Sequence, residues 1–461
     1  MIDKELQLKL LRKVLCNGGE YADIFVEHRG QTSLVLEDGK LEKVVTGTES
    51  GVGLRLIYEG KTAYAFSNDL SEKALMQAAH ETSRAAAGGA FERPIDLEVK
   101  KPSVTFDIKR PPAEIPIGKK IQLVREADGT ARRFDGRIKQ VTAIYRDSVQ
   151  KVQIATSDGI FAEDERVYTT MIVQVIAVHG GVIQTGYEPI GGFAGFEIFD
   201  HNDVGELSLK AAKRAVMMLS ARKAPGGRMP VVISSRAGGT IIHEAIGHGL
   251  EADLAQQGLS VFSGKIGKRV ASPLITVMDD ATLPGKRGSF RFDDEGVPSQ
   301  RTVLVEKGIL QSYLYDKLTS LKDNVRSTGN GRRESYRHRP IPRMTNTFIA
   351  EGGMSAADIL GSLDKGLLVE KMGGGQVNTV TGDFVFDVQE GYLIENGSIG
   401  EPVRGATLTG NGPSVLESID MVADDLGFSI GTCGKDAQGV PVSDAVPTVR
   451  IPEIVVGGAY D

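Results

Sequence analysis

The chain has 461 residues, a length that predicts two or three domains, each large enough to form its own hydrophobic core. Hydrophobic residues make up 41% and charged residues 25% of the sequence, values typical of globular proteins, which exclude a disordered or fibrous chain. The net charge of -6 at pH 7 repels nucleic acids and anionic membranes, so neither is expected as a partner.

The N-terminal segment is predicted to be helical over residues 5–16, because leucines recur there at helical spacing and Asn17-Gly18-Gly19 ends the pattern. It lacks the apolar core of a signal peptide, and no apolar run in the chain reaches the roughly 18 residues of a membrane-spanning helix. Cys16 and Cys433 lack the spacing of a disulfide framework, which favours a reducing compartment. We therefore expect a cytoplasmic protein.

Antiparallel hairpins are expected over residues 22–67, where apolar and polar residues alternate between the turn signals Asp38-Gly39 and Glu59-Gly60. Residues 70–89 have helical composition, and the proline-rich segment 101–118 leads to another helix.

That next helix is predicted at 118–134, before a second strand series over 139–192 and a long helix at 203–222. The order of helix, hairpins and helix therefore occurs twice. This repetition indicates an internal structural duplication.

Residues 223–230, KAPGGRMP, are interpreted as a linker between an N-terminal domain of residues 1–222 and a C-terminal domain of residues 231–461. The second half begins with a strand at 231–234 and continues as many short strands separated by glycines. The expected fold class is α+β. Antiparallel hairpins with flanking helices form the first domain, and the second is β-rich and barrel-like.

Residues 240–253, TIIHEAIGHGLEAD, are close to the zinc-peptidase motif H-E-x-x-H, but His243 and His248 are five residues apart instead of four. In a regular α-helix, five residues rotate the side chain by roughly 140°, so the two rings could not chelate one ion. A π-bulge would align them, and Gly247 and Gly249 would lower the cost of that distortion.

A catalytic zinc ion usually takes three protein ligands, so a third donor is needed beside the histidines. A thiolate is the softer donor, and the glycine-flanked segment GTCGKDAQG could bring Cys433 close to a metal, although a buried unreactive thiol also fits this cysteine. Cys16 is interpreted as a small core residue. The candidates for the third ligand are Glu251, Asp253, Asp279, Asp280 and Cys433.

Arginines are concentrated in residues 326–343, RSTGNGRRESYRHRPIPR. The segment is interpreted either as a loop that contacts substrate carboxyls, an oxyanion or a partner subunit, or as a solvated basic loop. Its candidate substrate-binding residues are Arg332, Arg333 and His338. One basic loop in an acidic chain is a weak indication of nucleic-acid binding.

Glycine-rich strands at 373–382 are the expected place for an extended substrate to add to a sheet edge, which makes Gly374 and Gly375 further candidates for substrate binding. The run of glycines lacks the lysine and hydroxyl residue of a P-loop, and no dinucleotide-binding motif is present. No nucleotide cofactor is expected.

Several motifs together resemble the TldD/PmbA family. They are HEAIGHGLEAD, GNGRRESYRHRPIPRMTNTFI, GGGQVNTVTGDFVFDVQEGYLIENG, PVRGATLTGNG and GTCGKDAQG, with LVLEDGKLE and GVGLRLIYEGKTAYAF near the N-terminus. The resemblance covers nearly the whole chain. Because the H-E-x-x-x-H motif is retained, the chain is similar to the TldD-like branch and not to the PmbA branch, which lacks the metal ligands.

The resemblance implies a cytoplasmic zinc metallopeptidase that acts on unfolded or extended peptides and carries one zinc ion per subunit. It assigns the metal to His243, His248 and Cys433, and the general base to Glu244. It also implies two-domain α+β subunits that pair with a PmbA/TldE-like chain or form homodimers. The alternatives are a catalytically silent partner subunit and a structural zinc site with four ligands.

Overall fold

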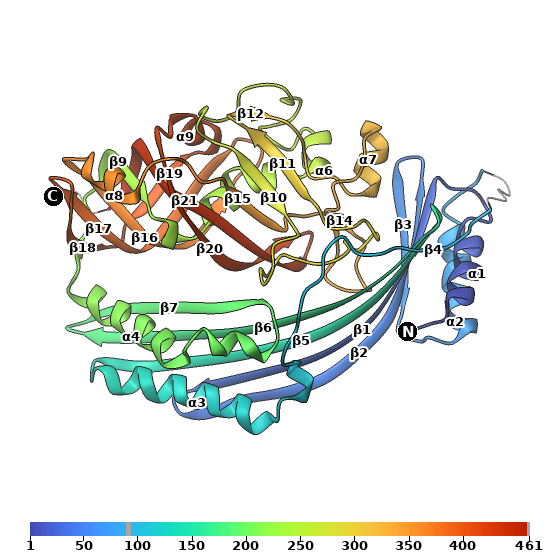
Figure 1. Cartoon of the computed structure of the whole chain (residues 1–461), viewed down its shortest axis with the longest axis horizontal. Coiled ribbons are helices and arrows are strands. Elements are labelled where there is room, and N and C mark those ends of the chain that lie inside the picture. The colour runs from blue at the N-terminus through green and yellow to red at the C-terminus, as the bar shows by residue number, and fades with distance from the viewer. Residues whose placement is uncertain (89–93, 459–461) are drawn as a thin grey trace.

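Two large β-sheets dominate the computed structural model, which describes residues 1–88 and 94–458 (Figure 1). The first sheet has the order β3-β2-β1-β5-β6, with β4 and β7 also paired to β6. Its strands are β1 (Tyr21–Glu37), β2 (Lys40–Tyr58), β3 (Lys61–Ser67), β4 (Glu98–Val99), β5 (Ile138–Thr156), β6 (Ile160–His179) and β7 (Val182–Phe193). The hairpins predicted over 22–67 and 139–192 are confirmed as β1–β3 and β5–β7.

Four helices accompany this sheet in the order that the sequence predicts. They are α1 (Lys4–Val14), α2 (Glu72–Ser83), α3 (Ile117–Phe134) and α4 (Val204–Ser220), with short 3₁₀ turns at Pro112–Glu114 (η1) and Phe196–Asp200 (η2). The helix predicted over 70–89 is shorter than expected, and Gly89 lies outside the described residues. A unit of helix, three strands and helix thus occurs twice, and the two units join where β1 pairs with β5.

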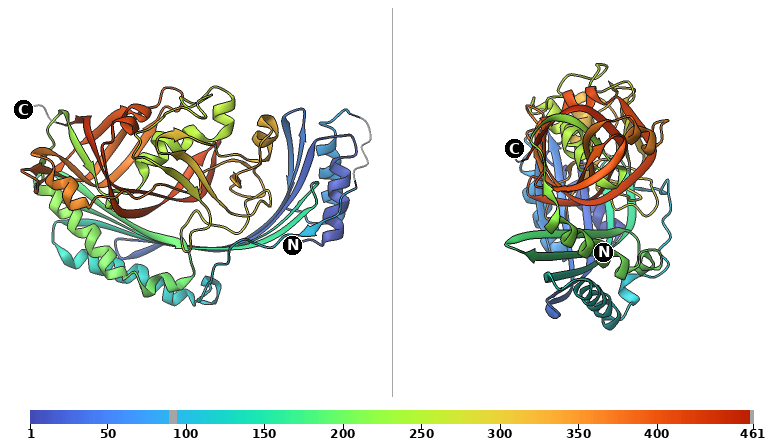
Figure 2. Two further views of the ribbon diagram at one scale, coloured as in Figure 1. Left: turned by 45° about the horizontal axis from the view of Figure 1, so that its top comes forward. Right: turned by 90° about the vertical axis from the view of Figure 1, so that its left-hand side faces the viewer.

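The first sheet is strongly curved, with the four helices on its convex side and the second half of the chain in its concave side (Figures 1 and 2). Strand β1 contacts both the helices and the second half of the chain, because successive side chains of a strand point to opposite faces of the sheet. Ile24 packs with α1 and α2, and Leu34 packs with α3 and α4. Phe25 instead packs with Phe292 and Tyr336 of the second half. One strand therefore contributes to the cores on both sides.

The second sheet contains a barrel, because β19 pairs with both β17 and β21 and so closes the ring β9-β16-β17-β19-β21. The ring is seen end-on in the right-hand view of Figure 2. The barrel-like domain expected for the second half is therefore confirmed. The strands of this ring are β9 (Gly227–Ile233), β16 (Lys365–Val377), β17 (Asp383–Glu395), β19 (Thr407–Asn411) and β21 (Gln438–Gly457).

The rest of the second half surrounds this ring. Its strands are β8 (Arg222–Lys223), β10 (Val277–Asp280), β11 (Arg301–Glu306), β12 (Ile309–Leu310), β15 (Asn346–Ile349), β18 (Ser398–Arg404) and β20 (Met421–Lys435), with β13 (Gly331–Arg332) and β14 (Ile341–Pro342) as a small separate sheet. Its helices are α5 (Thr240–Ile242), α6 (Ala252–Gln256), α7 (Lys317–Asp323), α8 (Ala356–Gly361) and α9 (Gly412–Ser418).

Residues 223–230, interpreted as a linker from their composition, are part of the second sheet. Lys223 belongs to β8, and β9 begins at Gly227, earlier than the strand expected at 231–234. The glycines and prolines of this segment therefore do not keep it out of the sheet, because β9 lies between β16 and β21 and its backbone groups pair with both. Across the described residues, no helix is both long and apolar enough to cross a membrane.

Candidate metal centre

The histidine segment follows β9 and a 3₁₀ turn at Ser235–Ala237 (η3), and it is not a regular α-helix. After α5 it widens into a π-helical turn at His243–Gly247 (η4) and then tightens into a 3₁₀ turn at His248–Leu250 (η5). The backbone N–H of His248 donates to the carbonyl of His243, which is the five-residue hydrogen bond of a π-helix. The predicted bulge is confirmed, and it brings the two rings to the same side.

The glycines around His248 serve packing, whereas the sequence suggested that they ease backbone distortion. Gly247 has an ordinary right-handed φ of -54°. A Cβ atom at this position would lie 2.2 Å from Sδ of Met344, and one at Gly249 would lie 2.7 Å from the ring of Phe262. The bulged turn is therefore pressed closely against its neighbours.

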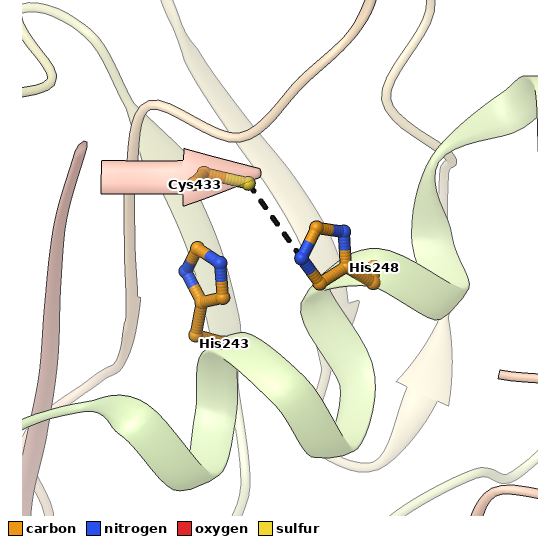
Figure 3. Close-up of side chains that lie close together, drawn as sticks. All are labelled: His243, His248 and Cys433. Carbon is orange, nitrogen blue, oxygen red and sulfur yellow. Dashed lines mark hydrogen bonds between the residues drawn. The ribbon is translucent and has the colours of Figure 1, made fainter. Parts of the chain in front are cut away.

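Cys433, near the end of β20, lies opposite the two histidines (Figure 3). One ligand atom from each of His243, His248 and Cys433 lies within 4.8 Å of the others, and Sγ of Cys433 is 3.6 Å from Nε2 of His248. The structure thus brings together two sequence segments separated by 185 positions. These are the three residues that the family resemblance selects.

Glu251 contacts the other side of the His248 ring, where its Oε2 is 3.0 Å from Nδ1. Although burial acts to raise the pKa of Glu251, the charges of Lys435, His248 and Arg343 lower it to about 2. The ionised carboxylate favours a proton on Nδ1 and orients the ring with Nε2 towards Sγ of Cys433. Such an outer carboxylate is a common companion of a metal-binding histidine.

His243 and Cys433 have the properties expected of metal ligands. Nδ1 of the buried His243 has no hydrogen-bond partner in the part of the chain that the structure describes, and Oδ2 of Asp444 is 3.8 Å away from it. Burial acts to raise the pKa of Cys433, but hydrogen bonds with His243 and His248 hold it well below its ordinary value. Two imidazoles and a thiolate form a donor set that suits zinc.

The other acids considered as third ligands are occupied elsewhere. Asp253 pairs with Lys435 at 2.6 Å, and Asp280 pairs with Arg301 at 2.8 Å. Asp279 is buried and accepts hydrogen bonds from Asn330, Thr345 and Thr347. Of the five candidates, Cys433 is therefore the residue that the structure brings to both histidines.

A cleft of about 480 Å³ opens over this group, and Glu244 lines it beside His243, His248 and Cys433. Burial raises the pKa of Glu244 above its ordinary value, against the opposing effect of the two histidines. A carboxylate with a raised pKa is suited to accept a proton and to release it again.

Of the candidate substrate-binding residues, the structure brings Gly375 to the cleft, where Gln376 and Val377 line it as well. Gly374 is on the same strand but is not part of the lining.

The three candidates of the arginine-rich segment lie elsewhere. Arg332 is buried and donates to the carbonyls of Met344 and Pro441, and Arg333 is buried against Asp23. His338 contacts Ser335. Two of the three basic side chains are thus buried, whereas a solvated basic loop, one of the two interpretations of this segment, would expose them.

The supporting residues around the histidines were only partly recognisable from the sequence. Glu251 was considered as a ligand, whereas it contacts the far side of His248. Lys435 is two positions after Cys433, and its Nζ is 3.1 Å from Oε2 of Glu251. Its presence in the GTCGKD segment is a signal for this contact, but the pairing depends on how β20 crosses the histidine segment.

Models of the PmbA/TldA metallopeptidase match the chain in three parts: domain 1 at residues 22–86, the central domain at 110–219 and the C-terminal domain at 226–458. A metalloprotease TldD homologue of Haemophilus influenzae is 40% identical over 95% of this chain and 93% of its own length. A protein of Methanocaldococcus jannaschii that is named a metalloprotease is 36% identical over 96% of this chain and 98% of its own length.

Two crystal structures share the fold. A protein of Thermotoga maritima described as a putative modulator of a DNA gyrase aligns with a TM-score of 0.81 and 23% identity, over 98% of this chain and all of that one. TldE of Thermococcus kodakarensis aligns with a TM-score of 0.78 and 19% identity, again over 98% of this chain and all of that one. At these identities the likeness concerns the fold alone.

Proposed function

Since the chain belongs to the PmbA/TldD metallopeptidase family, we propose that it is a zinc-dependent metallopeptidase that cleaves unfolded or extended peptides. The observation that carries the proposal is the convergence of His243, His248 and Cys433 in a cleft that Glu244 also lines. Three protein ligands, as opposed to four, are the usual number for a catalytic zinc site.

His243, His248 and Cys433 would hold the zinc ion, one per subunit. Bound there, zinc would supply Lewis-acid chemistry that lowers the pKa of water and polarises the peptide carbonyl. Glu251, which contacts Nδ1 of His248, would orient the ring so that Nε2 is presented to the ion. Glu244 is the general base, which takes the proton from the attacking water and passes it to the leaving amine.

The substrate is proposed to bind as an added strand along β16. Beyond Val369, none of the described strands pairs with the edge of β16 that faces β9. The same strand continues to Gly375, Gln376 and Val377 in the wall of the cleft. Main-chain hydrogen bonds to such an edge give affinity without strong side-chain preference, and they require an extended chain. This accounts for selection of unfolded substrates.

We further propose that the protein works in the cytoplasm and pairs either with a TldE-like chain or with a second copy of itself. The family resemblance supports a paired arrangement of such chains, and TldE of Thermococcus kodakarensis has the same fold. The likeness to TldE also favours a second candidate function, that of a catalytically silent partner subunit. The presence of Glu244 together with the three donor residues argues for the peptidase.

The test combines elemental analysis of the purified protein with cleavage of unfolded casein, with and without a chelator. We expect one zinc ion per chain and cleavage that stops when the chelator is added. Glu244→Gln should abolish cleavage and keep the zinc, because the amide cannot accept the proton. Glu126→Gln, at an exposed position on α3, is the matched control and should cleave normally.

Turnover by Glu244→Gln at the rate of the unchanged protein would exclude Glu244 as the base. Stoichiometric zinc without any cleavage by the unchanged protein would favour the silent partner subunit.

A further inference from the structure

A basic cleft of about 480 Å³ lies between the concave face of the first sheet and β20. Arg29 on β1 and Arg146 on β5 point into it from the sheet, and Arg287 reaches it from the loop between β10 and β11. A smaller cleft of about 240 Å³ shares Arg29, Arg287 and Thr432 with it, so the two form one basic groove.

Among the residues that the structure describes, no carboxylate pairs with these three arginines, in contrast to several buried arginines nearby. Arg55, Arg166 and Arg333 each pair with an aspartate. In contrast, no carboxylate of residues 1–88 and 94–458 lies within 4.0 Å of a guanidinium nitrogen of Arg29, Arg146 or Arg287.

Buried donor atoms of two of these arginines are also unused. The Nε atoms of Arg29 and Arg287 are buried, and no described residue accepts a hydrogen bond from them. Burial and the charges of Arg146 and Arg29 lower the pKa of Arg287. A buried donor without a partner is costly, and a bound anion could accept a hydrogen bond from it.

Acids that border the basic groove are already engaged and do not neutralise it. Asp147 pairs with Lys120 at 2.5 Å, and Asp294 pairs with Arg166 at 2.6 Å. Glu334 accepts the backbone N–H of Gly439 and keeps its charge. Five arginines line the smaller cleft against the two acids Asp294 and Glu334, so the groove keeps a positive charge.

Thr432 connects the basic groove to the candidate metal centre. It precedes Cys433 on β20 and lines both the basic groove and the cleft over the histidines. Nη2 of Arg287 is 3.4 Å from Oγ1 of Thr432. A peptide extended across the metal cleft would therefore pass beside a residue that also lines the basic groove.

We propose that Arg29, Arg146 and Arg287 form a subsite that binds a carboxylate of the peptide being cleaved, an inference that rests on the proposed function. The carboxylate belongs either to an acidic side chain or to the C-terminus of the peptide. Guanidinium groups suit this ligand because their donors match the two carboxylate oxygens. Peptides with a carboxylate that reaches this subsite are thus preferred over neutral ones.

The test measures kcat/KM for short peptides of one neutral sequence. In one series a single Glu, compared with Gln, is moved along the peptide, and the C-terminus is amidated. In the other series the Gln peptide has a free or an amidated C-terminus. We expect a preference of about tenfold for one charged peptide over its neutral match, the effect of a charge-assisted hydrogen bond. The series in which the preference occurs identifies the source of the carboxylate.

Arg146→Gln should reduce this preference towards one, and the side chain can be replaced safely because it makes no ion pair or hydrogen bond with the described residues. Arg125→Gln, at an exposed position of α3 outside the groove, is the matched control and should keep the preference. Equal cleavage of charged and neutral peptides by the unchanged protein would overturn the proposal. A change of oligomeric state in Arg146→Gln, with the preference for charged peptides unchanged, would also overturn it. The groove would then be assigned to the binding of a partner chain.

A binding measurement separates this proposal from the proposed function. Fluorescence anisotropy with labelled Glu and Gln peptides on the Glu244→Gln protein reports affinity without turnover. A preference that depends on Arg146 supports the subsite even if no peptide is cleaved. Cleavage of peptides with no charge preference in either measurement overturns the subsite and leaves the peptidase in place.

Discussion

Cys433 is the residue on which the proposed metal site depends most. Its Sγ completes the group formed by His243 and His248, and the nearby acids that could replace it are engaged in other contacts. Cys433→Ser should lose zinc on dialysis, because a serine hydroxyl stays protonated and binds zinc poorly. Elemental analysis before and after dialysis measures this loss.

Cys16→Ser is the control for this prediction, since Cys16 lies beyond the end of α1 and its Sγ is 3.7 Å from Oδ1 of Asn17. This variant should keep its metal. Stoichiometric zinc in dialysed Cys433→Ser would instead return the role of third ligand to an acid such as Glu251.

Residue identities predicted the metal centre only in part. The five-residue spacing of His243 and His248 was sufficient to predict the π-helical turn, because a regular helix would separate the rings. Cys433 became the preferred ligand through resemblance to a family. Its proximity depends on the path of β20, which local sequence patterns do not encode.

At the scale of elements, the π-helical turn is held by its surroundings. A Cβ atom at Gly247 would overlap Sδ of Met344, a side chain that is itself fully buried. Gly247→Ala should therefore destabilise the protein by about 1–3 kcal/mol, the usual cost of overpacking a core. It should also weaken zinc binding, because His248 is the next residue. Urea denaturation and metal analysis measure the two effects.

Gly361→Ala is a matched control, because a Cβ atom at this position on α8 meets nothing within 4 Å. Its stability should be unchanged or slightly higher. If Gly247→Ala were as stable as the unchanged protein and kept its zinc, the packing role assigned to Gly247 would be wrong.

Hairpins and helices of the first half were predictable because their signals are local. Apolar alternation gives the strands, and Asp38-Gly39 and Glu59-Gly60 adopt the positive φ angles of tight hairpin turns. The composition of 223–230 did not indicate that β9 begins at Gly227, because the pairing of β9 with β16 and β21 joins distant strands. Pairing between distant strands is a tertiary property.

At the scale of the whole molecule, a buried ionic network joins the first sheet to the second half. Arg55 on β2 pairs with Asp23 on β1 at 2.5 Å and with Glu295 of the second half at 2.6 Å. Arg333 adds a contact to Asp23 at 3.2 Å. All four side chains are buried. If residues 1–222 and 231–461 are two domains, as we propose, this network fixes their relative position.

Arg55→Met should destabilise the protein by about 3–5 kcal/mol, because it leaves the buried carboxylate of Glu295 without its ion-pair partner and that of Asp23 with Arg333 alone. Burial raises the pKa of Glu295 to about 8, and Arg55 opposes that rise, so the variant raises it further. An acid whose folded-state pKa is raised gives stability below its unfolded pKa, and this stability is lost as pH rises through the folded pKa. The loss in the free energy of unfolding, relative to the unchanged protein, should therefore be smaller near about pH 5 than near about pH 8.

Urea denaturation at both pH values measures this deficit. Arg84→Met is the control, since Arg84 pairs with Glu81 at an exposed position and its loss should have little effect at either pH. If Arg55→Met lowered the free energy of unfolding equally at both pH values, the proposed protonation of Glu295 in the variant would be wrong.

The distance in sequence between the histidines and Cys433 has a consequence for how the protein is made. During synthesis the histidine segment leaves the ribosome 185 positions before its third partner. The metal group is therefore incomplete until Cys433 has been added and β20 has paired with β21. If the protein is the peptidase that we propose, the nascent chain, which is itself an unfolded polypeptide, would thus be protected from premature self-digestion by the order in which its parts are made.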